Sequence, residues 1–421
     1  MENPTPPHYR RNYILLLADY VLFGMGMNFM GVSTVLPAFV RLLTNSAPII
    51  GMVNTVWNGA WLIPQLAAAN ALNHVPRKKG ALVRSGLFSR LSLILIALAL
   101  TMGLWQRPGW MLVAFFALLT LFWALDAFCS IAWFDIVAKV IPASQRGRLF
   151  GAGQIISSLI AIGIGTFVRW ILGARGPAFP ANFAWLFALA GISTLLGLIA
   201  LALLVEPLED VPEERASWSD YLPQLITILR EQAAYRRVIA AWLLSGLAGL
   251  ASPFYVLYAT DHLGLAQETI GLFIIAQTLG GLAGSFGFGA LAERNGPGAV
   301  IRVSVAVGAS GPLAALAIHF ARMASWLSVA YAWVFVVLGI VGSSMMLGFM
   351  NYILELAPPG HRPTYMGLSN TLGGLLVLVP MLGGWLLEAT SYPVLFAAAI
   401  VGPVLALAIA LRLPGVPSQD S

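Results

Sequence analysis

Charged residues are scarce in this sequence. Only 10% of its 421 residues are Asp, Glu, Lys or Arg, whereas a soluble globular domain carries about 25%. The chain has a single cysteine, Cys129, so an intrachain disulfide is excluded. The five histidines are scattered, and neither an H-E-x-x-H nor a G-x-S-x-G motif occurs. We therefore expect no enzymatic activity, no metal centre and no bound cofactor.

Long apolar runs take the place of charge. Hydrophobic residues make up 59% of the chain and the mean hydropathy is +0.84. Many runs exceed the roughly 20 residues that a helix needs to cross a bilayer. Because the alternation typical of a barrel is missing, the runs predict an all-α membrane protein with twelve transmembrane helices. The expected spans are residues 13–40, 48–73, 81–104, 109–138, 149–172, 181–205, 237–260, 268–291, 299–320, 326–353, 364–387 and 392–411.

The basic residues are distributed unevenly between the two sides of the membrane. With the N-terminus inside, seventeen Lys and Arg residues fall in inner segments, and Arg90 lies within a span. The outer segments hold only Arg41, Arg107, Arg169, Arg175 and Arg322. This positive-inside bias predicts that both termini are cytoplasmic, in a multi-pass protein of the plasma membrane, the inner membrane of a bacterium. It also explains the net charge of +6 without a nucleic-acid partner. We expect the first run to remain as a span, because it is too long for a cleaved signal peptide.

One polar stretch divides the spans six and six. It predicts an N-terminal six-helix bundle at 1–205, a cytoplasmic linker at 206–236 and a C-terminal six-helix bundle at 237–421. Apolar residues of the linker between Trp218 and Leu229 fall at helical spacing, which fits either a helix on the membrane surface or an ordinary solvated linker. The segments "IPASQRGRLFG" (141–151) and "APPGHRPTYMG" (357–367) align at a constant offset, and such a repeat is typical of transporters that rock two bundles about a central site.

A short loop after the eighth span makes the resemblance specific. Residues 289–296 read Gly-Ala-Leu-Ala-Glu-Arg-Asn-Gly, which resembles the G-x-L-A-D-R-x-G loop of the major facilitator superfamily. "RGRLFG" (146–151) and "PMLGGWLLEATSYPVLF" (380–396) are similar to stretches common in its bacterial members. The resemblance covers the whole chain. It implies two pseudosymmetric six-helix bundles that work by rocker-switch alternating access.

The same resemblance implies a cytoplasmic gate around that loop. In the family the loop acid caps a helix of the opposite bundle, so Glu293 would face the start of the fifth span near Arg148. A solvated loop acid is the alternative. The gate would also include Gly289, Arg294 and Gly296. In the first-half copy His74 replaces the acid, so we expect an asymmetric gate.

The repeat predicts further gate residues at matched positions. Lys139 aligns with Glu355 and Arg146 with Arg362. Lys139 and Glu355 could pair across the inner gate, or Lys139 could pair with Asp135 one helical turn earlier on its own helix. Both alternatives stay open at the level of sequence.

Two acids fall inside predicted spans at more than one helical turn from either end, where each charge costs at least about 2.5–3.5 kcal/mol. Asp19 lies in the first span and Asp126 in the fourth, on a stripe with Trp123 and Trp133. The resemblance implies that the first, fourth, seventh and tenth spans line the cavity. An acid whose carboxyl group is neutral when it is shielded from water and ionised when it is exposed to water can carry a proton. A protonated acid that is hydrogen-bonded to a neighbouring helix is the structural alternative.

Polar and aromatic residues of other spans complete the predicted cavity. Four such residues of the second span share one helical face, which fits a polar wall of the cavity or packing between helices equally well. The second half contributes aromatics and amides but no charge within the membrane. The residues concerned are Asn54, Asn58, Trp61, Gln65, Tyr255, Tyr258, Gln277 and Asn351.

These observations predict a secondary active transporter for small molecules, driven by a proton gradient and embedded in the lipid bilayer as a monomer. No Arg or Lys sits at the centre of a cavity helix, which favours neutral, hydrophobic or cationic cargo over phosphates and dicarboxylates. Proton-coupled export is the first hypothesis. Uptake of a small neutral nutrient such as a sugar is the second, because the fifth span lacks the Gly-Pro pair of similar drug exporters. A non-transporting member that acts in lipid or pigment handling or in membrane-complex assembly is the third.

Overall fold

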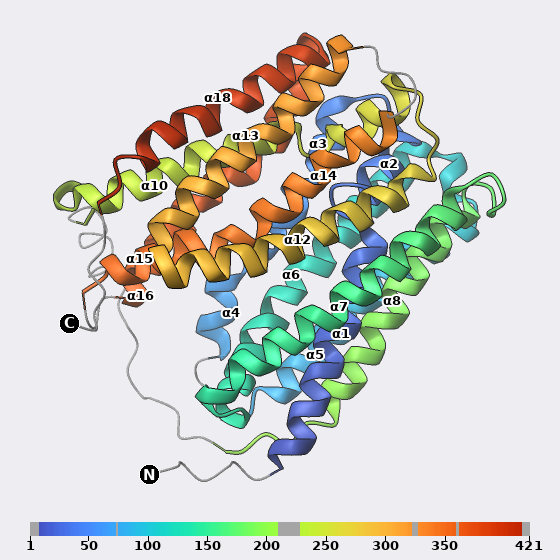
Figure 1. Ribbon diagram of the computed structural model, residues 1–421. Coiled ribbons are helices and arrows are strands. Elements are labelled where there is room, and N and C mark those ends of the chain that lie inside the picture. The colour runs from blue at the N-terminus through green and yellow to red at the C-terminus, as the bar shows by residue number, and fades with distance from the viewer. Residues whose placement is uncertain (1–7, 73–74, 209–227, 322–326, 359–361, 415–421) are drawn as a thin grey trace. The chain divides into compact units, whose positions relative to one another are not determined.

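The fold is helical throughout the residues that the structure describes. A computed structural model describes residues 8–72, 75–208, 228–321, 327–358 and 362–414 (Figure 1). No strand occurs in these segments. Within them, eleven helices are long and apolar enough to cross a membrane, so the chain is a multi-pass membrane protein.

The helices group into two compact units. Unit 1 contains residues 1–45, 53–214 and 266–274, and unit 2 contains residues 46–52, 215–265 and 275–421. The bundle and linker boundaries at residues 205 and 237 stay a prediction.

Unit 1 is built mainly from five long helices that pack against one another. Helix α1 packs against α7 and α8, and α5 packs against α6 and α8 (Figure 1). Small residues allow the close approach, since a Cβ on Gly26 of α1 would lie 2.5 Å from the Thr194 side chain of α8. The helices of this unit are α1 (Tyr9–Met30), α2 (Val35–Arg41), α3 (Ala47–Leu62), α4 (Gln65–Leu72), α5 (Lys79–Thr101), η1 (Leu104–Gln106), α6 (Pro108–Val140), α7 (Ala143–Leu172) and α8 (Ala181–Ala202). The first residues of α3, up to residue 52, are counted with unit 2.

Unit 2 differs because several of its spans are interrupted. The span that starts with α10 passes through a 3₁₀ turn and ends in a π turn, and the span that starts with α14 continues through a second π turn. The elements are α10 (Ala233–Gly246), η2 (Leu247–Ala251), α11 (Phe254–Leu257), η3 (Tyr258–His262), α12 (Thr269–Asn295), α13 (Pro297–Ala321), α14 (Leu327–Ser344), η4 (Met345–Met350), α15 (Asn351–Leu356), α16 (Arg362–Gly373), η5 (Gly374–Leu378), α17 (Val379–Ala389) and α18 (Tyr392–Ala410). The first residues of α12, up to residue 274, are counted with unit 1.

The structure changes two of the sequence-based expectations. The predicted first span bends after Met30, where Gly31 has a φ of 41°. The predicted second span is divided between α3 and α4 around Ile63 and Pro64, because proline lacks the N–H that would continue the helix. This divided span is not among the eleven candidate membrane-spanning helices. The expected total of twelve transmembrane helices and the cytoplasmic location of both termini therefore stay predictions. The expected linker helix falls almost entirely on residues 209–227, outside the described residues.

Candidate functional site

Three charged side chains are buried together in unit 1. Asp19 of α1, Arg90 of α5 and Asp126 of α6 are 6%, 3% and 5% exposed, respectively. A buried charge is stable only when it is paired or hydrogen-bonded. The contacts of each member therefore decide what this cluster can do.

Arg90 and Asp126 form a direct ion pair. The Arg90 Nη1 atom lies 2.7 Å from the Asp126 Oδ1 atom and also donates to the Ser89 hydroxyl at 3.1 Å. That hydroxyl in turn donates to the Phe122 carbonyl at 2.8 Å. The guanidinium carbon lies 5.2 Å from the centre of the Phe23 ring, within reach of a cation–π interaction. Arg90 is thus held in one position by helices α1, α5 and α6.

Asp19 has a different environment. Its Oδ2 atom accepts a hydrogen bond from the indole Nε1 of Trp133 at 2.9 Å. A Cβ atom on Gly197 would lie only 2.9 Å from its Oδ1 atom, so the glycine leaves room for the carboxyl group. Within the described residues, no Lys or Arg nitrogen is at salt-bridge distance from this carboxyl group. With both acids ionised the cluster carries one negative charge in excess, and a proton on Asp19 makes it neutral.

Sequence reasoning assigned no role to Arg90. The statement that no Arg or Lys sits at the centre of a cavity helix concerned only the first, fourth, seventh and tenth spans, and Arg90 of the third span brings a buried cation to Asp126. Because this cation is already paired with Asp126, the expectation of neutral, hydrophobic or cationic cargo stays a prediction. A signal was present in the sequence, because a lone Arg inside a span requires a partner and Asp126 was the nearest acid within a span.

The remaining candidates in unit 1 are divided between the interior and the surface. Trp123 is buried and its ring centre lies 4.2 Å from that of Trp57, a residue that sequence reasoning missed. The Trp123 indole nitrogen has no hydrogen-bond partner in the described part of the chain. On α3, Asn54 is buried, and Asn58 is exposed and donates to the Asn54 carbonyl at 2.9 Å. Trp61 and Gln65 are half-buried.

The candidates in unit 2 belong to an aromatic cluster rather than a charged one. Tyr255 and Tyr258 are buried, and the Tyr331 hydroxyl donates to the Tyr255 carbonyl at 2.9 Å. The Tyr258 hydroxyl lies 2.9 Å from His319 Nδ1, and the rings of His262 and His319 are stacked 5.5 Å apart. The other two predicted residues of this half, Gln277 on α12 and Asn351 on α15, are half-buried.

One of the predicted gate residues in unit 1, Lys139, belongs to an ionic network. The Glu206 carboxylate accepts hydrogen bonds from the backbone N–H groups of Lys78 and Lys79 at 2.9 and 2.8 Å, which caps the start of α5. Lys139 lies 2.7 Å from Asp135 and 3.3 Å from Glu206, so the pair with Asp135 is formed in this structure. Asp135 also binds Lys78 at 2.7 Å. Arg146 donates to the Ala138 and Ile141 carbonyls, and Arg148 is exposed.

The gate motif of unit 2 lies at the end of α12. Gly296 has a φ of 75° and donates its N–H to the Ala292 carbonyl, so the glycine is required to end the helix. Glu293, Arg294 and Glu355 are exposed, and Gly289 lies within α12. His74 and the side chain of Arg362 lie outside the described residues. The pairing of Glu293 near Arg148 stays a prediction.

No group of three or more His, Cys, Asp or Glu side chains could hold a metal ion in the part of the chain that the structure describes. The buried charges of unit 1 are therefore the strongest candidates for function. They suit proton exchange, because the cluster holds one more acid than base.

Comparisons with known proteins bear on the family and the fold of this chain. The model of the Major Facilitator Superfamily matches residues 20–376 and 237–421. The enterobactin exporter EntS of Shigella flexneri is 25% identical over 333 residues, which cover 77% of this chain and 74% of the exporter.

Solved structures show the same fold at low identity. A D-xylose-proton symporter has a TM-score of 0.68 and 15% identity, covering 97% of this chain and 98% of the symporter. A bacterial homologue of the iron transporter ferroportin, in an inward-facing state, has a TM-score of 0.67 and 17% identity, covering 96% and 98%.

Proposed function

Because this chain belongs to the Major Facilitator Superfamily, a family of membrane transporters, we propose that it is a secondary active transporter that exports neutral, hydrophobic or cationic small molecules in exchange for protons. It works by rocker-switch alternating access in the bacterial inner membrane, as a monomer. The observation that carries the proposal is that Asp19 is buried and accepts a hydrogen bond from Trp133, whereas the second buried acid, Asp126, forms an ion pair with Arg90.

The two acids have different tasks in this mechanism. Asp126 is neutralised by Arg90 at 2.7 Å, so it gains little from a proton and serves to position the guanidinium. Among the described residues no Lys or Arg nitrogen lies at salt-bridge distance from Asp19, so a proton can neutralise this buried carboxyl group. When the site opens to water, the carboxyl group can release its proton because solvent then stabilises the ionised form. Asp19 is therefore the proton carrier, and the Trp133 indole N–H orients its carboxylate.

Export is supported by the likeness to the enterobactin exporter EntS, which covers 77% of this chain. The aromatic lining adds to this support, since the Trp57–Trp123 pair in unit 1 offers apolar ring surface. Aromatic faces bind hydrophobic compounds and attract organic cations. The proposed cargo class follows from these surfaces.

A growth test and a vesicle assay test the proposal together. In an efflux-deficient host, the wild-type protein should raise resistance to a panel of amphipathic toxic compounds, including the fluorescent cation ethidium. In everted vesicles, an imposed proton gradient should drive ethidium uptake by the wild type and fail to drive it in Asp19→Asn. The matched control is Glu388→Gln, which removes an exposed acid outside the cluster and should transport normally.

Two outcomes would contradict proton-coupled export. One is equal gradient-driven transport by Asp19→Asn and the wild type, with equal amounts of folded protein. The other is sensitisation of the host instead of resistance, or growth on a new carbon source.

The second of these outcomes would favour uptake of a small neutral nutrient. That alternative rests on the amides of α3, where Asn58 is exposed and donates to the Asn54 carbonyl. Amides hydrogen-bond neutral hydroxyl-rich molecules without adding charge. Absence of both transport and compound binding would favour a non-transporting role in lipid or pigment handling or in membrane-complex assembly.

A further inference from the structure

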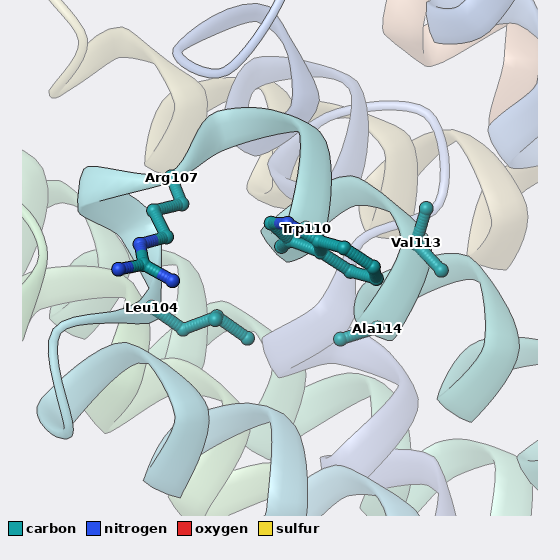
Figure 2. Close-up of a pocket in the computed structure, with 5 residues that line it drawn as sticks. All are labelled: Leu104, Arg107, Trp110, Val113 and Ala114. Atoms are coloured by element: carbon teal, nitrogen blue, oxygen red, sulfur yellow. The ribbon is translucent and has the colours of Figure 1, made fainter.

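A pocket lies in unit 1 at the turn between α5 and α6. It has a volume of about 300 Å³ and is lined by Leu104, Arg107, Trp110, Val113 and Ala114. Figure 2 shows the Trp110 indole between Arg107 on one side and Val113 on the other. None of these residues belongs to the charged cluster around Asp19, so this pocket is a separate site.

The lining of the pocket changes from cationic to apolar. Arg107 is exposed at one end, and in the described segments no carboxylate lies at salt-bridge distance from its guanidinium. Trp110 and Val113 are 66% and 61% exposed, although apolar. A ligand that matches this lining is anionic at one end and hydrocarbon at the other.

The position of the pocket fits the boundary between water and lipid. It begins in the turn that joins the spans Lys79–Thr101 and Pro108–Val140, and turns between spans lie at the membrane surface. From Arg107 to Val113 the chain rises about 9 Å along α6, at about 1.5 Å per residue. That rise is comparable to the depth of one headgroup layer, which is roughly 5–8 Å. This rise matches a position of Arg107 at the level of the phosphates and of Val113 at the start of the hydrocarbon.

We infer that this pocket binds an anionic glycerophospholipid. The Arg107 guanidinium pairs with the lipid phosphate, Trp110 packs against the glycerol region, and the acyl chains run along Val113 and Ala114. A planar guanidinium can donate two parallel hydrogen bonds to one phosphate. The indole of a tryptophan is favoured at this depth because it has an apolar body and a polar N–H.

A lipid fits better than a soluble phosphate for a physical reason. A small hydrophilic anion would contact Arg107 alone and would leave the apolar wall of Trp110, Val113 and Ala114 in contact with water. A phospholipid covers that wall with hydrocarbon, and burial of apolar surface is favourable. The site therefore selects a ligand that carries both parts.

Native mass spectrometry of the full-length protein in mild detergent tests this inference. The probes are dioleoylphosphatidylglycerol, dioleoylphosphatidylcholine and water-soluble glycerol 3-phosphate. We expect the wild type to bind phosphatidylglycerol more tightly than phosphatidylcholine by about fivefold, the factor equivalent to about 1 kcal/mol for one basic residue at an anionic lipid surface. Glycerol 3-phosphate should neither bind detectably nor compete.

Three variants locate the site. Arg107→Gln should abolish the preference for phosphatidylglycerol, and Arg107→Lys should keep part of it because the positive charge remains. The matched control is Arg175→Gln, which removes an exposed arginine from another inter-span segment, outside the pocket, and should keep the preference. An equal loss in Arg175→Gln, or no preference in the wild type, would overturn the inference. Binding of glycerol 3-phosphate with the affinity of the lipid would show a simple phosphate site instead.

Discussion

The two units organise their interiors differently. In unit 1 the uninterrupted helices α1, α5 and α6 hold two acids and one arginine in contact with each other or with an indole. In unit 2 the buried tyrosines form a neutral aromatic cluster, and the helices around it contain 3₁₀ and π turns. Ion pairs need fixed geometry because their gain falls when distance and angle vary. π turns, in contrast, are frequent at functional sites where a helix changes shape. The two units therefore differ in kind: buried ion pairing is found in unit 1, and interrupted helices around buried tyrosines are found in unit 2.

The largest difference between the units should appear when the ion pair is broken. Arg90→Gln leaves Asp126 buried without its cation, and loss of one partner of a buried pair costs about 3–5 kcal/mol. We expect a matching decrease in stability in thermal or denaturant unfolding of the detergent-solubilised protein. The double variant Arg90→Gln/Asp126→Asn should recover most of the loss, because no unpaired charge remains. A cost below about 1 kcal/mol for the single variant would contradict the role of the pair.

A second comparison concerns the two copies of the gate loop. Glu293 remains in the unit 2 copy, whereas His74 stands at the acid position in the unit 1 copy. We expect Glu293→Gln to lower the transport rate by about fivefold, which corresponds to the roughly 1 kcal/mol that a charge contributes at a helix end. His74→Gln should have little effect. Initial rates in vesicles measure both variants, and equal effects would mean that the gate is symmetric.

The smallest effect should come from the neutral cluster of unit 2. Tyr258→Phe removes the hydroxyl that lies 2.9 Å from His319 Nδ1, and a neutral hydrogen bond contributes about 1 kcal/mol. Unfolding of Tyr258→Phe, His319→Phe and the double variant gives the coupling energy between the two side chains. A coupling as large as the cost of Arg90→Gln would remove the contrast between the two units.

Much of the architecture could be predicted from sequence. Runs of apolar residues define membrane helices because the bilayer excludes unpaired backbone groups, and the structure places eleven candidate spans close to the predicted positions. The glycine at the end of the gate motif has the positive φ that favours this residue. The break of the second span at Pro64 was also visible in the sequence. The prediction overlooked this break because it used the hydropathy of residues 48–73 and did not consider the proline.

The candidate site was only partly predictable. Asp19, Asp126, Trp123 and Trp133 were singled out, but helical periodicity states only which residues share a face of one helix. It does not state which neighbouring helix that face meets. For this reason the role of Arg90, the Trp57–Trp123 pair and the cap that Glu206 provides to α5 were all missed.

The sequence by itself determined that this chain is a membrane protein and that it belongs to a transporter family with an internal repeat. It also determined that two acids lie within membrane-spanning segments. Tertiary structure alone decided the partners of those acids. Arg90 reaches Asp126 across 36 residues of sequence, Trp133 reaches Asp19 across 114, and Glu206 reaches Lys78 across 128. The physical reason is that local propensity sets each helix, whereas the partner of a buried charge is set by how the helices pack.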